Sequence, residues 1–198
     1  MITLQYNDSG TIERLQGLRA QAVNPRAMMA AVGREGANQL RRHFRQRDKT
    51  PNKLGGKRQH FWLQVMRSVQ VPVVEADGRA VTLSINHPAF AQKVFGGTIR
   101  AQRAGALTIP VDPEAYGRTA AVFERETGLQ LIFIKSTNRA LLCTRAQGSD
   151  TLQVRYLLTP SVEQPGDPDA LPAMGEGSGF QAAILARAQA VVDRQLAS

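Results

Sequence analysis

Alternating apolar and polar residues in the second half of the chain constrain its fold most strongly. Residues 129–133 and 152–158 alternate in this way, and residues 141–144 continue the pattern as a further strand between polar turns. Because successive side chains of a strand point to opposite faces of a sheet, alternation is typical of strands that bury one face. These segments therefore predict an antiparallel sheet with one buried face. The most regular alternation is that of Leu152, Val154, Tyr156 and Leu158.

A long helix is predicted over residues 25–47. Asn24 supplies a helix cap and Pro25 the first helical position. Gly33 and Gly36 leave part of the helix surface low, which favours close packing against a neighbouring element. The apolar stripe of this helix, spaced four residues apart, consists of Met28, Val32, Gly36, Leu40 and Phe44.

A second helix is predicted at the end of the chain, where Ser178 and Gln181 have the spacing of a capping box. Shorter elements are a strand over residues 2–6, a helical segment over 11–22 and a hairpin over 71–85. The apolar stripe of the final helix consists of Phe180, Ala183, Ile184, Ala188, Val191, Val192 and Leu196.

The middle of the chain contains an aromatic pair and a pair of adjacent glycines. Phe61 and Trp62 recur with Val65 at helical spacing, and we expect them to lie in the core. Gly96 and Gly97 stop a short helix and shape the loop that follows, because glycine adopts backbone angles closed to other residues.

Together these elements predict an α+β fold. We expect a small antiparallel β-sheet packed with a long helix in the N-terminal half and a C-terminal helix, with extended loops, and a single domain over residues 1–198. Residues 48–60 are turn-forming and basic and predict a loop. Residues 160–179 are rich in Pro and Gly and predict an extended connecting arm without a packed element.

Basic residues are concentrated near the N-terminus. The net charge of the chain is +9, and residues 1–60 hold 12 Lys and Arg against 4 Asp and Glu. In residues 41–58 eight bases accompany only Asp48. Such clustering indicates either an anionic partner, namely nucleic acid or an acidic protein surface, or a solvated loop.

Residue types that carry catalysis or bind metals are sparse. The single cysteine, Cys143, lies in an apolar segment and excludes an intrachain disulfide. His43, His60 and His87 have no metal-ligand spacing. Two acid pairs, at 112/114 and 124/126, are interpreted as solvated carboxylates. We therefore expect no enzymatic activity, no cofactor and no metal.

No apolar segment approaches the length of about 20 residues that a membrane helix needs, and the first residues lack the pattern of a secretory signal. We expect a soluble protein with no membrane partner.

Three segments resemble bacteriophage virion morphogenesis proteins of the tail-completion and head–tail joining (neck) type. They follow one another in order over about residues 40–172. The segments are His43-Phe44 through PNKLGGKRQHFW, ending at Phe61-Trp62; Phe95-Gly96-Gly97-Thr98-Ile99-Arg100 followed by Leu107-Thr108-Ile109-Pro110; and Tyr156-Leu157-Leu158 leading through Val162, Gln164 and Pro165 to Asp167-Pro168 and Pro172.

The resemblance implies a structural role without catalysis. Such a protein forms a homo-oligomeric ring, a hexamer or alternatively a dodecamer, at the head-proximal end of the tail and mediates head–tail joining. Its expected partners are the tail terminator or tail tube protein and the head-side connector, and packaged double-stranded DNA through non-specific phosphate contact. Its expected location is the virion tail or neck, after assembly in the host cytoplasm.

The candidate contacts with a partner or with a DNA channel are basic residues. They are Arg41, Arg42, Arg45, Arg47, Lys49, Lys53, Lys57, Arg58, Arg100 and Arg103.

Three other functions stay open. The first is a tail terminator ring protein. The second is a free nucleic-acid-binding module that uses residues 41–58. The third is an enzyme such as a peptidase, which would need residues distant in the sequence to converge in space.

Overall fold

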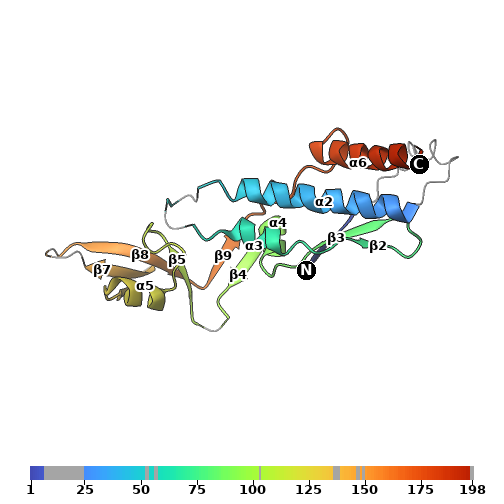
Figure 1. Ribbon diagram of the computed structural model, residues 1–198. Coiled ribbons are helices and arrows are strands. Elements are labelled where there is room, and N and C mark those ends of the chain that lie inside the picture. Colours follow the sequence, from blue (N-terminus) through green and yellow to red (C-terminus); the bar gives the residue numbers. More distant parts are fainter. Residues whose placement is uncertain are drawn as a thin grey trace. The chain divides into compact units, whose positions relative to one another are not determined.

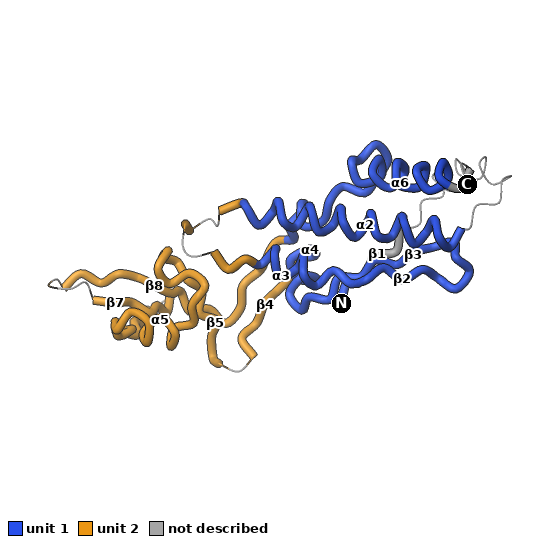
Figure 2. Tube along the Cα trace, viewed as in Figure 1, with its two compact units in different colours: residues 1–49, 61–95, 166–198 blue, residues 50–60, 96–165 orange. Residues whose placement is uncertain are grey.

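The computed structural model describes residues 1–6, 25–51, 54–55, 58–102, 104–135, 139–145, 148 and 150–196. The chain divides into two compact units (Figure 2). Unit 1 comprises residues 1–49, 61–95 and 166–198, and unit 2 comprises residues 50–60 and 96–165. The sequence predicts one domain, whereas each of these units has a hydrophobic cluster of its own. Both units combine helices with antiparallel strands, so the α+β class is confirmed.

Unit 1 is built around helix α2 (Pro25–Arg47), which has the predicted bounds. A three-stranded antiparallel sheet has the order β1 (Ile2–Tyr6), β3 (Val81–Ile85), β2 (Val73–Val74). Helix α6 (Gly179–Leu196) lies alongside α2 (Figure 1). Two short helices, α3 (Phe61–Arg67) and α4 (Phe90–Phe95), complete the unit.

The predicted apolar stripe of α2 is confirmed. Val32, Gly36, Leu40 and Phe44 are buried, and Met28 packs against the same cluster. The predicted apolar stripe of α6 is confirmed at four of its positions, which are buried. The backbone N–H of Gln181 donates to Ser178 Oγ at 3.2 Å, as the capping box predicts. The buried residues of α6 are Phe180, Ile184, Ala188 and Val192.

Aromatic rings connect α2 to the short helices. Phe44 stacks on Trp62 with ring centroids 6.0 Å apart, and it meets Phe90 edge-to-face at 5.5 Å. Phe61 contacts Trp62 edge-to-face at 5.1 Å. The expected core position of Phe61 and Trp62 is therefore confirmed. Aromatic burial of this kind contributes most of the apolar area in a small core.

Two glycines of α2 allow its close contact with the sheet. A Cβ atom on Gly33 would lie 2.5 Å from Val81 Cγ2 and 2.9 Å from Pro72 Cβ. A Cβ atom on Gly36 would lie 2.9 Å from Leu83 Cδ1. Val81 and Pro72 have little freedom to move aside because one is β-branched and buried and the other is a ring. The low surface predicted at these two glycines is thus confirmed.

Gly33→Ala should lower the free energy of unfolding by about 1–3 kcal/mol, because the overpacking outweighs the better helix propensity of Ala. Asn38→Ala, on the exposed side of the same helix, should stabilise slightly for the propensity reason alone. Urea denaturation of both variants measures this. Equal stabilisation by the two substitutions would contradict the close contact.

Unit 2 contains a four-stranded antiparallel sheet and one helix. The strand order is β5 (Leu107–Pro110), β8 (Leu152–Thr159), β7 (Ala140–Arg145), β6 (Ile132–Lys135), so the predicted antiparallel sheet is confirmed. The strand predicted over residues 129–133 begins instead at Ile132, and Phe133 is 58 % exposed. Helix α5 (Ala120–Thr127) begins after the cap Thr119 and ends at Gly128, which has φ +70°. Phe123 of this helix packs on Tyr156 of β8.

A separate two-stranded sheet corrects the prediction for residues 160–179. Strand β9 (Ser161–Gln164) pairs antiparallel with β4 (Gly97–Arg100). Pro160 ends β8 as its ring requires, but the chain then forms a new strand instead of an extended arm. Because strand pairing depends on a partner more than 60 residues away, the local Pro and Gly content concealed it.

The adjacent glycines behave as predicted. Gly96 has φ +71° and Gly97 has φ +123°, directly after α4. These angles favour glycine over any residue with a Cβ atom. The predicted helical segment 11–22 and the cap Asn24 lie outside the described residues.

An irregular pairing between β7 and β8 overturns the predicted burial of Leu152 and Val154. Leu142 pairs with Tyr156 and the next residue, Cys143, pairs with Val154, so Arg155 has no partner in the ladder. An extra residue of this kind places the side chains before it and after it on opposite faces. Tyr156 is accordingly fully buried, whereas Leu152 is 43 % and Val154 39 % exposed.

Candidate contact surfaces

The basic residues of α2 divide into structural and exposed groups. The Arg41 guanidinium donates to the carbonyl oxygen of Val69 at 3.1 Å. Arg47 donates to the Asp167 carboxylate and lies 4.9 Å from the centre of the Trp62 ring. Both arginines therefore hold unit 1 together. A contact of either arginine with a partner stays a prediction.

Asp167 also anchors the segment that leads to α6. Lys93 lies 3.7 Å from the same carboxylate, so two cations neutralise it. Ala170, three residues on, is fully buried. His43 Nε2–H donates to the backbone oxygen of Asp169 at 3.0 Å, since a carbonyl can only accept. This part of the predicted arm is thus packed against α2.

Burial lowers the pKa of His43 below its usual value of 6.5, and the nearby Arg47 adds to this effect. The hydrogen bond to Asp169 and the charge of that carboxylate oppose it. The pKa of His87 is also lowered by burial. Burial therefore favours the neutral form of both imidazoles in the folded protein.

The unfolded chain binds a proton at His43 more readily than the folded chain does. The contribution of neutral His43 to the free energy of unfolding should therefore be fully present well above pH 6.5. It should be lost as the pH falls below that value. The decrease should be smaller in His43→Gln, whose amide can still donate to Asp169. Urea titrations of both proteins between pH 8 and pH 5 test this. Identical pH profiles would contradict it.

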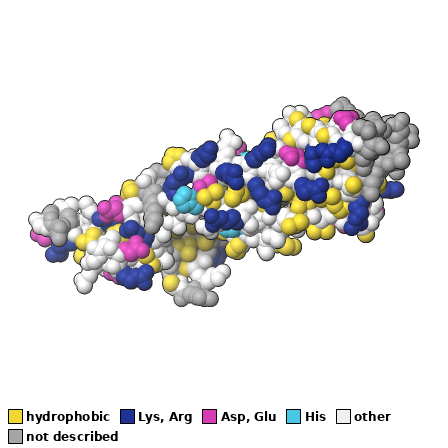
Figure 3. All heavy atoms as spheres, viewed as in Figure 1, with side chains coloured by type: hydrophobic (Ala, Val, Ile, Leu, Met, Phe, Trp, Pro, Cys, Tyr) yellow, Lys and Arg dark blue, Asp and Glu magenta, His cyan; other side chains and the backbone are white. Residues whose placement is uncertain are grey.

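The remaining basic candidates are exposed or lie outside the described residues. Arg42, Arg45, Lys49, Arg58 and Arg100 are exposed. Lys53, Lys57 and Arg103 lie outside the described residues. Arg34, which the sequence prediction missed, is exposed on the same side of α2 as Arg42 and Arg45. Figure 3 shows Lys and Arg side chains gathered over α2.

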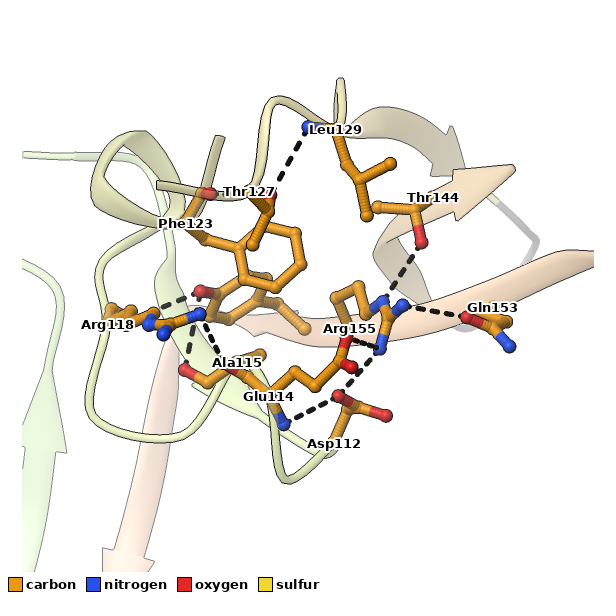
Figure 4. Close-up of polar contacts among 11 residues, drawn as sticks. Asp112, Glu114, Ala115, Arg118, Phe123, Thr127, Leu129, Thr144, Gln153 and Arg155 are labelled. Atoms are coloured by element: carbon orange, nitrogen blue, oxygen red, sulfur yellow. Dashed lines mark hydrogen bonds and ion pairs between the residues drawn. The ribbon is translucent and has the colours of Figure 1, made fainter. Parts of the chain in front are cut away.

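Arg155, the unpaired residue of β8, is the centre of a polar network in unit 2 (Figure 4). Its guanidinium contacts the carboxylates of Asp112 at 2.7 Å and Glu114 at 3.0 Å. It also donates to Thr144 Oγ1 at 2.9 Å and to Gln153 Oε1 at 2.7 Å. The side chain is only 7 % exposed. Its carboxylate partners supply the compensation that a buried charge requires.

The network corrects the interpretation of Asp112 as a solvated carboxylate. Asp112 is 26 % exposed and holds Arg155, and it caps its own turn by accepting from Glu114 N–H at 2.9 Å. Glu114 also contacts Arg155, but its side chain is 63 % exposed, in agreement with the predicted solvated carboxylate. In the second pair, Glu126 contacts Arg118 at 3.0 Å. These acids are bound by cations of the same unit and serve its architecture.

The residues beside Arg155 fasten the turn at 112–118 to the sheet. The Tyr156 hydroxyl lies 3.2 Å from the Arg118 oxygen and 3.4 Å from the Ala115 oxygen, and burial raises its pKa. Cys143 is 1 % exposed and burial raises its thiol pKa, in agreement with the predicted packing role.

Arg155→Gln should lower the free energy of unfolding of unit 2 by about 2–4 kcal/mol, because two ion pairs are removed and Thr144 is left buried without its donor. The matched control is Arg145→Gln on β7, whose ion pair with Asp150 is 3.8 Å long and exposed. That variant should leave the melting temperature unchanged. Equal effects of the two substitutions in calorimetry would contradict the anchoring role.

The four-stranded sheet of unit 2 has an apolar hollow. Val111 and Val154 are 44 % and 39 % exposed there, and the irregular pairing accompanies the exposure of Val154. A cavity of about 800 Å³ lies here, with the cations Lys135 and Arg139 among its lining residues. Its apolar lining consists of Val111, Ala140, Leu141, Val154, Leu157, Leu158 and Pro160. We call this surface the β-sheet hollow.

Within the described ranges, no group of three or more His, Cys, Asp or Glu is arranged to hold a metal ion. None of the helices in those ranges combines the length and the apolarity needed to cross a bilayer. Comparisons with family models, with curated proteins and with solved structures found no match.

Proposed function

We propose that this chain is a structural protein of the bacteriophage neck, which completes the tail and joins it to the head. It acts by binding copies of itself in a ring and by docking to the tail terminator or tail tube and to the head-side connector. The proposal rests on the sequence resemblance and on one structural observation, the exposed β-sheet hollow.

The positions of the resembling segments support a common architecture. Gly97 and Ile99 of the second segment pair with Gln164 and Val162 of the third. Likewise Ile109 pairs with Leu157. Segments that are distant in the sequence thus stabilise one another as strand neighbours.

The two ends of the first segment are in contact. Phe44 and Trp62 stack across the basic loop. This contact keeps the two ends of the loop together.

The β-sheet hollow supports docking between subunits. Exposed apolar side chains that gather on one face mark interaction surfaces, because their burial releases hydration water. Leu152 and Val154 could have been buried by the regular pairing, yet the irregular pairing at Arg155 exposes them. An exposed apolar face that a specific backbone feature maintains fits a protein that completes its core in an assembly.

Val154→Asp should abolish self-association, because the contact would have to remove a carboxylate from water in place of an apolar side chain. The matched control is Val71→Asp, at an 81 % exposed position of unit 1. Analytical ultracentrifugation of the full chain should show assembled wild type and control but monomeric Val154→Asp, with unchanged melting temperatures. A monomeric wild type, or an assembled Val154→Asp, would contradict the role of the hollow.

The neck assignment itself is tested in particles. Mass spectrometry of purified virions should detect the chain in a copy number that fits a ring. A deletion should leave tails that fail to join heads, visible by electron microscopy. Infectious particles without the chain would overturn the assignment, and a ring that stays on tails unable to join heads would favour the tail terminator alternative.

A further inference from the structure

We propose that the exposed face of α2 is a second binding surface, one that contacts the phosphate backbone of double-stranded DNA without reading its sequence. We call it the α2 basic face and define it by Arg34, Asn38, Arg42 and Arg45, all exposed. It differs from the predicted contacts on α2 because it includes Arg34 and Asn38 and excludes Arg41 and Arg47.

Helix geometry places these four side chains together. At about 100° per residue, Arg34, Asn38, Arg42 and Arg45 fall within an arc of about 80°. Arg34 and Arg45 are separated by about 16 Å along the axis. The buried stripe at Val32, Gly36, Leu40 and Phe44 occupies the opposite side of the helix. The α2 basic face is therefore held rigid by the core beneath it.

The three guanidinium groups are available for a ligand. Among the described residues no carboxylate forms an ion pair with Arg34, Arg42 or Arg45. The nearest acid in the helix, Glu35, accepts from Gln39 at 2.6 Å. Arg47 differs from these three arginines because Asp167 neutralises it, so its charge serves the fold of unit 1.

The composition of the face favours phosphate over an acidic protein surface. None of the large apolar side chains exposed in the described part of the chain lies on α2. Interfaces between proteins have an apolar centre within a polar rim, and this face lacks one. Arg and Asn donate hydrogen bonds to phosphate oxygens, and such contacts need no apolar partner. The apolar contact surface of this protein lies instead in unit 2.

The α2 basic face is separate from the β-sheet hollow, and its assignment to phosphate does not rest on the neck proposal. It goes beyond that proposal because it gives a ligand class to a second surface. Binding is measured with purified full-length protein and DNA alone, so the outcome is independent of particle assembly.

The test measures binding of a fluorescent random-sequence DNA duplex over a range of salt concentrations. The slope of log K against log salt is negative, and each phosphate contact that a substitution removes should lower its magnitude by about 0.9. The triple variant Arg34→Gln, Arg42→Gln, Arg45→Gln should therefore lower the magnitude of the slope by about 2.7 and should bind markedly more weakly at low salt.

The matched control removes the same charge from exposed arginines on other parts of unit 1. It is Arg67→Gln, Arg79→Gln, Arg194→Gln. This control should retain most of the wild-type slope and affinity. Melting temperatures establish that both triple variants fold.

Three results would overturn the inference. One is a wild type that does not bind duplex DNA at low salt. Another is an equal decrease of slope in the two triple variants, because binding would then follow net charge alone. The third is binding of poly-glutamate as tight as that of DNA with the same weakening in the α2 variant, because the face would then recognise acidic polypeptide.

Discussion

Close packing of α2 between the sheet of unit 1 and helix α6 is the constraint on which that unit depends. Gly33 and Gly36 let the backbone approach Val81 and Leu83 to a distance that no side chain would permit. Gly36 also lies near Phe180 and Ile184 of α6. The sheet and α6 both pack on the side of α2 that carries the buried stripe. The opposite side of the helix is therefore exposed to solvent, and the exposed arginines lie there.

In unit 2 the comparable constraint is one unpaired residue. Arg155 interrupts the ladder of β7 and β8, reaches Asp112, Glu114 and Thr144, and reverses the face that the preceding strand residues occupy. A single backbone irregularity thus produces both a buried ionic anchor and an exposed apolar face. If the apolar face is a contact surface, as we propose, the ion pairs behind it fix the geometry of that contact.

The two proposed surfaces differ in the chemistry they offer. The β-sheet hollow is apolar, with Lys135 and Arg139 at its lining, and suits a protein neighbour. The α2 basic face carries guanidinium and amide donors and suits phosphate. A protein at the junction of a DNA-filled head and a protein tail would use both kinds of contact, which is why the two proposals are compatible although neither depends on the other.

The sequence pattern predicts those features correctly that depend on interactions between residues close together in the chain. Helix α2 has its predicted bounds because Pro25 and the fourfold apolar spacing act within one helix. The capping residue Ser178 and the positive φ angles of Gly96 and Gly97 follow from the same short range. The antiparallel sheet was also predictable, because alternation marks each strand separately.

The sequence by itself determined the α+β class, the two long helices, the main sheet and the excess of basic residues. Only the tertiary structure decided which arginines of α2 are held inside unit 1, which acids are bound, that residues 161–164 form a strand and that Val154 is exposed. The physical reason is that each of these outcomes depends on a partner distant in the chain. A side chain such as Arg47 becomes structural only when folding brings Asp167 and Trp62 to it.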